Sequence, residues 1–113
     1  MKHIIVPVLM SLLSFLFACG EPEKITVTTG EFAEDFMRAI CERGVDCGFL
    51  VDANVEDCID IGVLDICQLA DCGATSTYDY SDYQDCLSAY DSFSCQLLDQ
   101  GAVPSECNTI MEF

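Results

Sequence analysis

Residues 57–69 read DCIDIGVLDICQL, and residues 85–97 read DCLSAYDSFSCQL. Both stretches open with Asp-Cys, leave eight residues and close with Cys-Gln-Leu, and an Asp-Cys-Gly tripeptide precedes each of them. Matching residues at these fixed spacings predict an internal duplication, with units at about residues 46–73 and 71–101. Because there are only two copies, we expect two helix-pair units and not a solenoid.

Helix boundary signals divide each unit into two short helices. In the first unit, Asn54 is placed to cap a helix that Gly62 interrupts, and a second short helix follows the glycine. In the second unit, Ser81 and Ser92 are placed to cap the two helices, and Gly101 ends the second one.

A further helix is expected ahead of the first unit. Thr28 and Glu31 have the spacing of a capping box, and the helix is expected to end near Gly44. Apolar residues recur every four positions along it, at Phe32, Phe36 and Ile40. With a final helical turn at 104–107, the chain predicts an all-α fold: a small disulfide-stapled bundle of short helices spanning residues 31–113.

The N-terminus has the layout of an export signal. Basic residues precede an apolar run that ends in Leu16-Phe17-Ala18-Cys19. The run from Ile4 to Ala18 has 15 residues and contains Pro7, so it is short for a membrane span, which needs about 20.

A cysteine directly after the small residue resembles the signal of bacterial lipoproteins. The resemblance implies that residues 1–18 are removed as a signal peptide and that Cys19 becomes the acylated first residue, holding the protein to a membrane. Gly20 stands where an aspartate would resemble the inner-membrane retention signal, which favours the outer membrane of the cell envelope. The alternatives are an ordinary secreted protein cut after Ala18 and an uncut membrane anchor.

The cysteine count agrees with lipidation. The chain has nine cysteines, and setting Cys19 aside leaves an even set that can pair fully in an oxidising compartment. We predict disulfides among Cys41, Cys47, Cys58, Cys67, Cys72, Cys86, Cys95 and Cys107. Eight cysteines allow 105 pairings, and the connectivity stays open.

The duplication restricts the pairing within the units. Nine residues of continuous helix separate two cysteines by about 13.5 Å, whereas a disulfide needs Cα atoms within about 7 Å. Cys58–Cys67 and Cys86–Cys95 can therefore form only if each unit bends at a corner, and we expect both of these pairs or neither.

Composition excludes several function classes. The mature chain, residues 19–113, carries three basic and 20 acidic residues, a formal charge of −17, and this charge repels nucleic acid and anionic headgroups. The single histidine, His3, lies in the signal, so Ser-His-Asp and Cys-His catalysis and histidine-ligated metals are excluded. We expect no enzyme and no cofactor.

Residues 19–30 are interpreted as the lipidated cysteine and a flexible tether. An alternation of apolar residues at Ile25 and Val27 leaves a short strand as the alternative.

Four tyrosines are clustered in the second half of the chain. Tyr83 and Tyr90 fit a buried helix face, whereas Tyr78 and Tyr80 form either a contact surface or part of the core.

Two kinds of metal site match the sequence only in part. The acidic run Asp52-x-Asn54-x-Glu56-Asp57 resembles the start of a calcium loop, but it lacks the sixth-position glycine and has Val63 at the twelfth position. A zinc or iron–sulfur cluster needs close cysteine pairs, and the only close spacing is Cys67-x₄-Cys72.

The cysteine-rich, acidic body resembles the uncharacterised small cysteine-rich lipoproteins of myxobacteria-like bacteria. The resemblance is carried by Cys86, Cys95, Gly101 and the segment Pro104-Ser105-Glu106-Cys107. We predict a non-enzymatic envelope module that binds a protein or glycan partner and no nucleic acid. The alternatives are a calcium-responsive surface protein and, third, a hydrolase using carboxylates alone. The sequence leaves the oligomeric state open.

Overall fold

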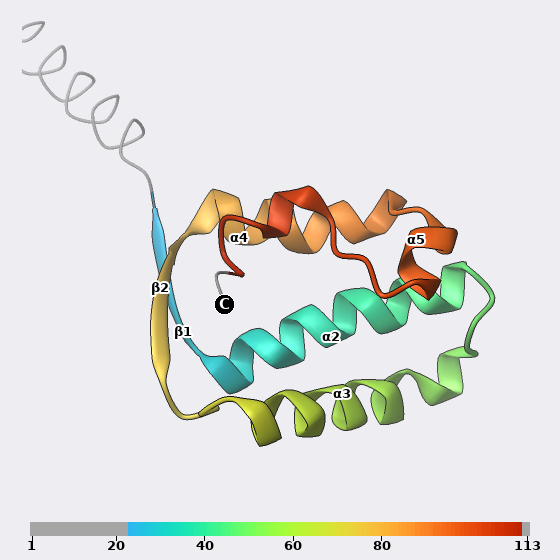
Figure 1. The fold of residues 1–113 in the computed structure, drawn as a ribbon, viewed down its shortest axis with the longest axis horizontal. Helices are drawn as coiled ribbons and strands as arrows, with labels where there is room; N and C mark the ends of the chain where they lie inside the picture. The colour runs from blue at the N-terminus through green and yellow to red at the C-terminus, as the bar shows by residue number, and fades with distance from the viewer. Residues whose placement is uncertain (1–22, 112–113) are drawn as a thin grey trace, which may run out of the picture.

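The computed structural model describes residues 23–111. Along the chain the elements are β1 Lys24–Thr28, α2 Thr29–Asp46, η1 Asp52–Asn54, α3 Val55–Leu69, β2 Thr75–Asp79, α4 Tyr80–Ala89, η2 Tyr90–Ser92, α5 Cys95–Asp99 and η3 Ser105–Cys107, where η marks a 3₁₀ turn. The predicted helical, disulfide-stapled architecture is confirmed (Figure 1). A small sheet joins the helices, and its first strand is the alternative that the sequence left open around Ile25 and Val27.

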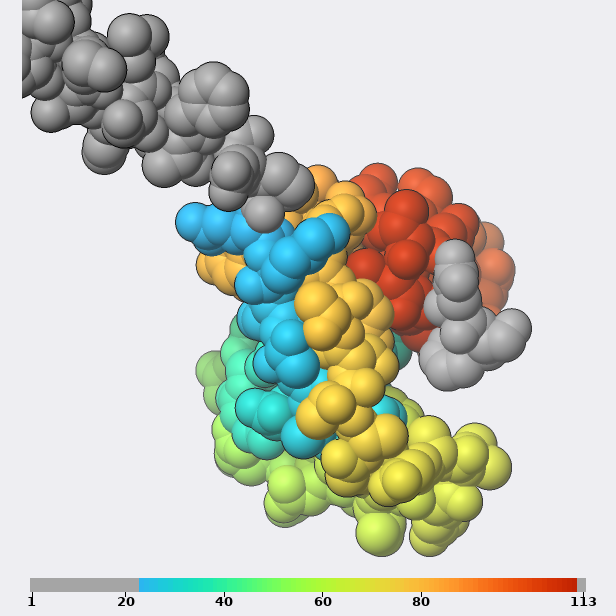
Figure 2. All heavy atoms as spheres, turned by 90° about the vertical axis from the view of Figure 1, so that its left-hand side faces the viewer, coloured from blue at the N-terminus to red at the C-terminus, as the bar shows by residue number. Residues whose placement is uncertain are grey.

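The sheet closes the α2–α3 hairpin. β1 and β2 pair antiparallel, with Lys24 opposite Asp79 and Thr28 opposite Thr75. Figure 2 shows the two strands side by side across one end of the molecule. The flexible tether predicted for residues 19–30 is therefore corrected, because an ordered strand begins at Lys24. The alternation around Val27 is the signal of this strand, and Val27 is buried.

Helix α2 is the central element of the fold. The predicted capping box is present: the Glu31 N–H donates to Thr28 Oγ1 (3.0 Å), and the Thr28 N–H donates to Glu31 Oε1 (2.9 Å). The helix continues two residues beyond Gly44, to Asp46. Its apolar stripe buries Phe36 in the core, with Phe32 packed beside it.

Helix α3 is continuous, so the prediction that Gly62 interrupts it was wrong. Gly62 lies where α3 meets α2, and a Cβ atom there would come 2.2 Å from Met37 Cε. The glycine therefore allows the two helices to approach closely and does not break the helix. Asn54 was also misassigned as a side-chain cap, since it lies in η1 and makes no capping hydrogen bond.

The C-terminal helices begin at positions other than those predicted. α4 starts at Tyr80, so Ser81 lies inside its first turn and does not cap it. The cap of α5 is Ser94, not Ser92, with its Oγ accepting from the Leu97 N–H at 3.3 Å. Gly101 follows α5 with φ +77°, in keeping with its predicted role as a helix stop.

The core lies between the sheet, α2, α4 and the C-terminal segment. Its buried members are Val27, Phe36, Tyr83, Cys86, Tyr90, Cys107 and Ile110. Tyr83 and Tyr90 occupy the buried face of α4 and η2, as predicted. Ile110 belongs to this core and Met111 packs against it, so the C-terminal segment folds back over α4.

All eight predicted cysteines form disulfides: Cys41–Cys58, Cys47–Cys95, Cys67–Cys72 and Cys86–Cys107. Neither intra-unit pair forms, which is one of the two outcomes expected from the like behaviour of the two units. Because α3 is continuous, it holds Cys58 and Cys67 apart. The internal repeat itself stays a prediction.

Candidate functional site

The predicted lipidation site falls in residues 1–22, outside the part of the chain that the structure describes. Cys19 and the signal peptide therefore stay predictions. Within residues 23–111, no helix is long and apolar enough to cross a bilayer.

A surface hollow of about 490 Å³ lies between α2, the start of α3 and the α4–η2 segment. Both arginines of the sequence, Arg38 and Arg43, line it among several carboxylates. Arg38 Nη1 lies 3.1 Å from Glu56 Oε1, which ties α2 to α3. This guanidinium is paired within the chain, so its role here is structural.

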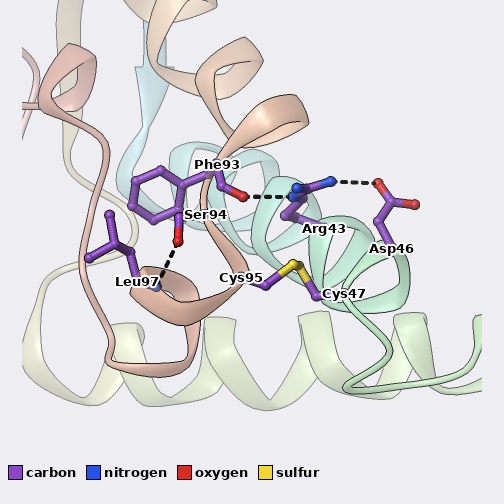
Figure 3. The surroundings of a disulfide bond; sticks show 7 residues. All are labelled: Arg43, Asp46, Cys47, Phe93, Ser94, Cys95 and Leu97. Carbon is purple, nitrogen blue, oxygen red and sulfur yellow. Dashed lines mark hydrogen bonds and ion pairs between the residues drawn. A yellow bond between two sulfur atoms is a disulfide. The ribbon is translucent and has the colours of Figure 1, made fainter.

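Arg43 links the end of α2 to the segment before α5. Its Nε–H donates to the Phe93 carbonyl oxygen at 3.0 Å, and Nη1 lies 3.6 Å from Asp46 Oδ2 (Figure 3). The disulfide Cys47–Cys95 lies beside these contacts and joins the same two segments. Arg43 and the disulfide therefore hold α5 against the end of α2.

Tyr83 and Tyr90 are both buried in the core, and Tyr90 also lines this hollow. The Tyr83 hydroxyl donates to Asp35 Oδ2 at 2.7 Å, and burial together with this bond raises the pKa of Tyr83. Burial raises the pKa of Tyr90 to about 12. The Tyr90 hydroxyl is buried and, among the described residues, finds no hydrogen-bond partner. Both phenols therefore stay neutral at physiological pH.

The residues of the calcium hypothesis are not gathered around one point. Asp52 and Asn54 lie in η1, whereas Glu56 on α3 is paired with Arg38. In the part of the chain that the structure covers, no three acidic, histidine or cysteine side chains are arranged as metal ligands.

The two tyrosines left open by the sequence behave differently. Tyr78 packs on the core, with its ring centroid 6.1 Å from that of Phe32 and 5.8 Å from that of Tyr83. Tyr80 is 43 % exposed at the start of α4. Only Tyr80 is therefore free to act as the predicted aromatic contact.

An apolar surface on α3 was missed by the sequence reasoning. Ile61, Leu64 and Leu69 are exposed, and Ile59 is the only buried residue of this helix. A second hollow, about 310 Å³, lies beside Leu64 between α3 and α2. The signal was present in the i, i+3 spacing of Ile61 and Leu64, but the presumed corner at Gly62 placed them on separate helices.

Comparison of the chain with protein-family models, curated proteins and solved structures finds no match.

Proposed function

We propose that this protein is an envelope lipoprotein, anchored through lipid on Cys19, whose domain is a non-enzymatic binding module. One observation carries the proposal: the eight cysteines from Cys41 to Cys107 pair completely with one another. Of the nine cysteines, this leaves Cys19 as the one to be acylated, and it stands in the lipoprotein-like box. The resemblance to small cysteine-rich myxobacterial lipoproteins points the same way.

The position of β1 sets the reach of the anchor. Four residues, 20–23, separate Cys19 from Lys24. A chain of this length spans at most about 17 Å, so the domain stands close to the bilayer. Lys24 pairs with Asp79 beside the start of α4, whereas α3 lies on the opposite side of α2 (Figure 1). The anchor thus leaves α3 accessible to a partner, and Gly20 favours the outer membrane.

A binding role fits the chemistry of the domain better than catalysis. The mature chain has no histidine, and its eight non-lipidated thiols are held in disulfides. The arginines in the large hollow are engaged by carboxylates of the same chain. Exposed apolar side chains on α3 offer contact area instead. We include the duplication of units 46–73 and 71–101 in this proposal, on the strength of their shared cysteine spacing.

The test is the intact mass of the protein from a detergent-solubilised envelope fraction, alkylated with and without reductant. We expect a lipid-bearing Cys19 and eight cysteines that take up label only after reduction. The matched control is Cys19→Ser. This variant should be lost from the envelope fraction, and its eight other cysteines should remain protected from label. An unlipidated chain, or free thiols without reductant, would overturn the anchored-module proposal. A melting temperature that rises with calcium but not with magnesium would instead favour the cation-responsive alternative.

A further inference from the structure

Helix α3 presents an apolar face that no other described element covers. The helix packs against α2 and η1 and buries Ile59 on that side. On the outer side, Ile61 and Leu64 are 62 % and 60 % exposed, although they lie one helical turn apart on the same face. Two neighbouring exposed aliphatic side chains of this kind form the centre of a small contact surface.

The hollow beside this face is lined by both apolar and acidic side chains. Ile59, Val63 and Leu64 contribute aliphatic side chains, and Glu34 and Asp60 contribute carboxylates. Its volume of about 310 Å³ is at the lower end of ligand pockets. It can therefore receive an aliphatic side chain whose neighbours carry positive charge.

The charge around the face is of one sign. Helix α3 contains four acidic residues and no basic residue. Within residues 23–111 the three basic side chains are already paired: Lys24 with Asp79, Arg38 with Glu56, and Arg43 with Asp46. The remaining acidic groups on the outer face of α3 are Asp57, Asp60 and Asp65, which are exposed.

This charge decides the class of occupant. Two copies of the mature chain, each with a formal charge of −17, repel one another. An anionic lipid surface repels the chain for the same reason. A basic segment is attracted, because it pairs with carboxylates that form no ion pair within residues 23–111. Aliphatic residues on the same segment bury Ile61 and Leu64.

We infer that the outer face of α3 docks a cationic, amphipathic segment of a partner protein. An aliphatic side chain enters the hollow between α2 and α3, and flanking Lys or Arg residues meet Asp57, Asp60 and Asp65. The inference rests on the proposed binding function and names its surface and its class of partner.

The test is selection from a peptide-display library on detergent-solubilised, full-length protein captured through a C-terminal tag. We expect the selected peptides to combine aliphatic with Lys or Arg residues, and their affinity to fall as salt rises from about 20 to about 300 mM. Selected peptides without basic residues would overturn the inference.

Surface variants locate the binding. Ile61→Ser/Leu64→Ser should weaken the selected peptides about tenfold or more, whereas Leu97→Ser/Val103→Ser, at positions 42 % and 39 % exposed, should not. Asp57→Asn/Asp60→Asn should lower affinity and reduce the salt dependence, and the charge-matched Asp85→Asn/Asp99→Asn should leave both unchanged. Far-UV circular dichroism checks that each variant folds.

The outcomes separate this inference from the proposed function. Binding that survives Ile61→Ser/Leu64→Ser overturns the α3 site while the binding module stands. Failure to enrich any peptide over a reduced, unfolded control counts against both. A dimer that Ile61→Ser/Leu64→Ser dissociates would assign the face to a second copy and overturn the cationic partner.

Discussion

Helices α3 and α4 pack on opposite sides of the same helix, α2, yet they are held by different means (Figure 1). On α4 and the turn that follows it, Tyr83, Cys86 and Tyr90 are each at most 1 % exposed. On α3, a longer helix of 15 residues, only Ile59 is buried. The α4 side is a packed aromatic core, whereas α3 is held by disulfides near its two ends.

The two sides of α2 depend on different interactions for their stability. Large buried aromatic side chains stabilise the α4 side through the area that they remove from water. The α3 side has a disulfide near each end, Cys41–Cys58 and Cys67–Cys72, and a close helix approach at Gly62. Because disulfides hold α3, its outer surface stays accessible to solvent. The inner face of α4, in contrast, is buried in the core.

The largest difference in stability is expected between the removal of two disulfides. Replacing Cys86 and Cys107 by alanine should lower the free energy of unfolding by about 5 kcal/mol, because this bond closes a 21-residue separation and both cysteines are 0 % exposed in the core. Replacing Cys67 and Cys72, five residues apart and only partly buried, should cost about 2 kcal/mol. Guanidinium unfolding followed by circular dichroism measures both losses. Equal losses would mean that loop length and burial of the cysteines do not set the contribution of each bond.

The next largest difference in stability is expected between two isoleucine variants of α3. Ile59→Ala should cost about 3 kcal/mol, because it removes the one side chain that α3 buries. Ile61→Ala, two residues along and 62 % exposed, should change stability by no more than about 0.5 kcal/mol. Thermal unfolding of the two variants beside the wild type makes the comparison. A large loss in Ile61→Ala would mean that the outer face of α3 is covered in the native protein.

A smaller effect is expected at the helix crossing. Gly62→Ala should cost about 1.5 kcal/mol net, since the overlap with Met37 outweighs the gain in helix propensity. In a Met37→Ala background the same change should become neutral or stabilising, because the obstructing side chain is gone. A double-mutant cycle measures this coupling. Additive effects would show that the two residues do not limit the helix approach.

The smallest changes in stability are expected at two tyrosines on the α4 side. Tyr83→Phe should cost about 1 kcal/mol, because it removes a hydrogen bond to Asp35. Tyr90→Phe should be neutral or slightly stabilising, because the hydroxyl that it removes is buried without a partner. Chemical denaturation at neutral pH measures both changes. A marked loss in Tyr90→Phe would reveal a hydrogen bond to that hydroxyl.

The same tyrosines predict how stability depends on alkaline pH. Below about pH 10, where tyrosine is neutral in both states, their contribution is fully present. Because burial raises the pKa of Tyr90 to about 12, the unfolded chain ionises first, and stability falls as pH rises through this window. Tyr90→Phe should reduce the steepness of that fall in unfolding curves recorded at pH 9 to 12. An unchanged slope would mean that Tyr90 does not ionise differently in the two states.

Features fixed by neighbouring residues were predictable from the sequence. The capping box of Thr28 and Glu31, the stop at Gly101 and the buried face of Tyr83 and Tyr90 all follow from spacings within a few turns of helix. Disulfide formation was predictable from the even set of eight cysteines that remains when Cys19 is set aside, although the connectivity was not.

Features that depend on distant partners were not predictable. β1 is a strand because residues 75–79 pair with it, and nothing near Lys24 reveals that partner. Gly62 breaks no helix because Met37, on another helix, uses the space that its missing side chain leaves. The exposed face of α3 was hidden by the same error, since Ile61 and Leu64 share a face only if the helix is continuous.

The uninterrupted helices have a consequence for oxidative folding. Three of the four bonds skip an intervening cysteine, so a chain that oxidised neighbouring thiols in order would first join Cys41 to Cys47. Once α2 has formed, the six-residue step from Cys41 to Cys47 holds their Cα atoms about 9 Å apart, whereas a disulfide needs about 7 Å or less. Helix α3 separates Cys58 from Cys67 in the same way. The helices thus act as spacers that forbid the nearest wrong pairings, and thiol exchange can proceed to the native set.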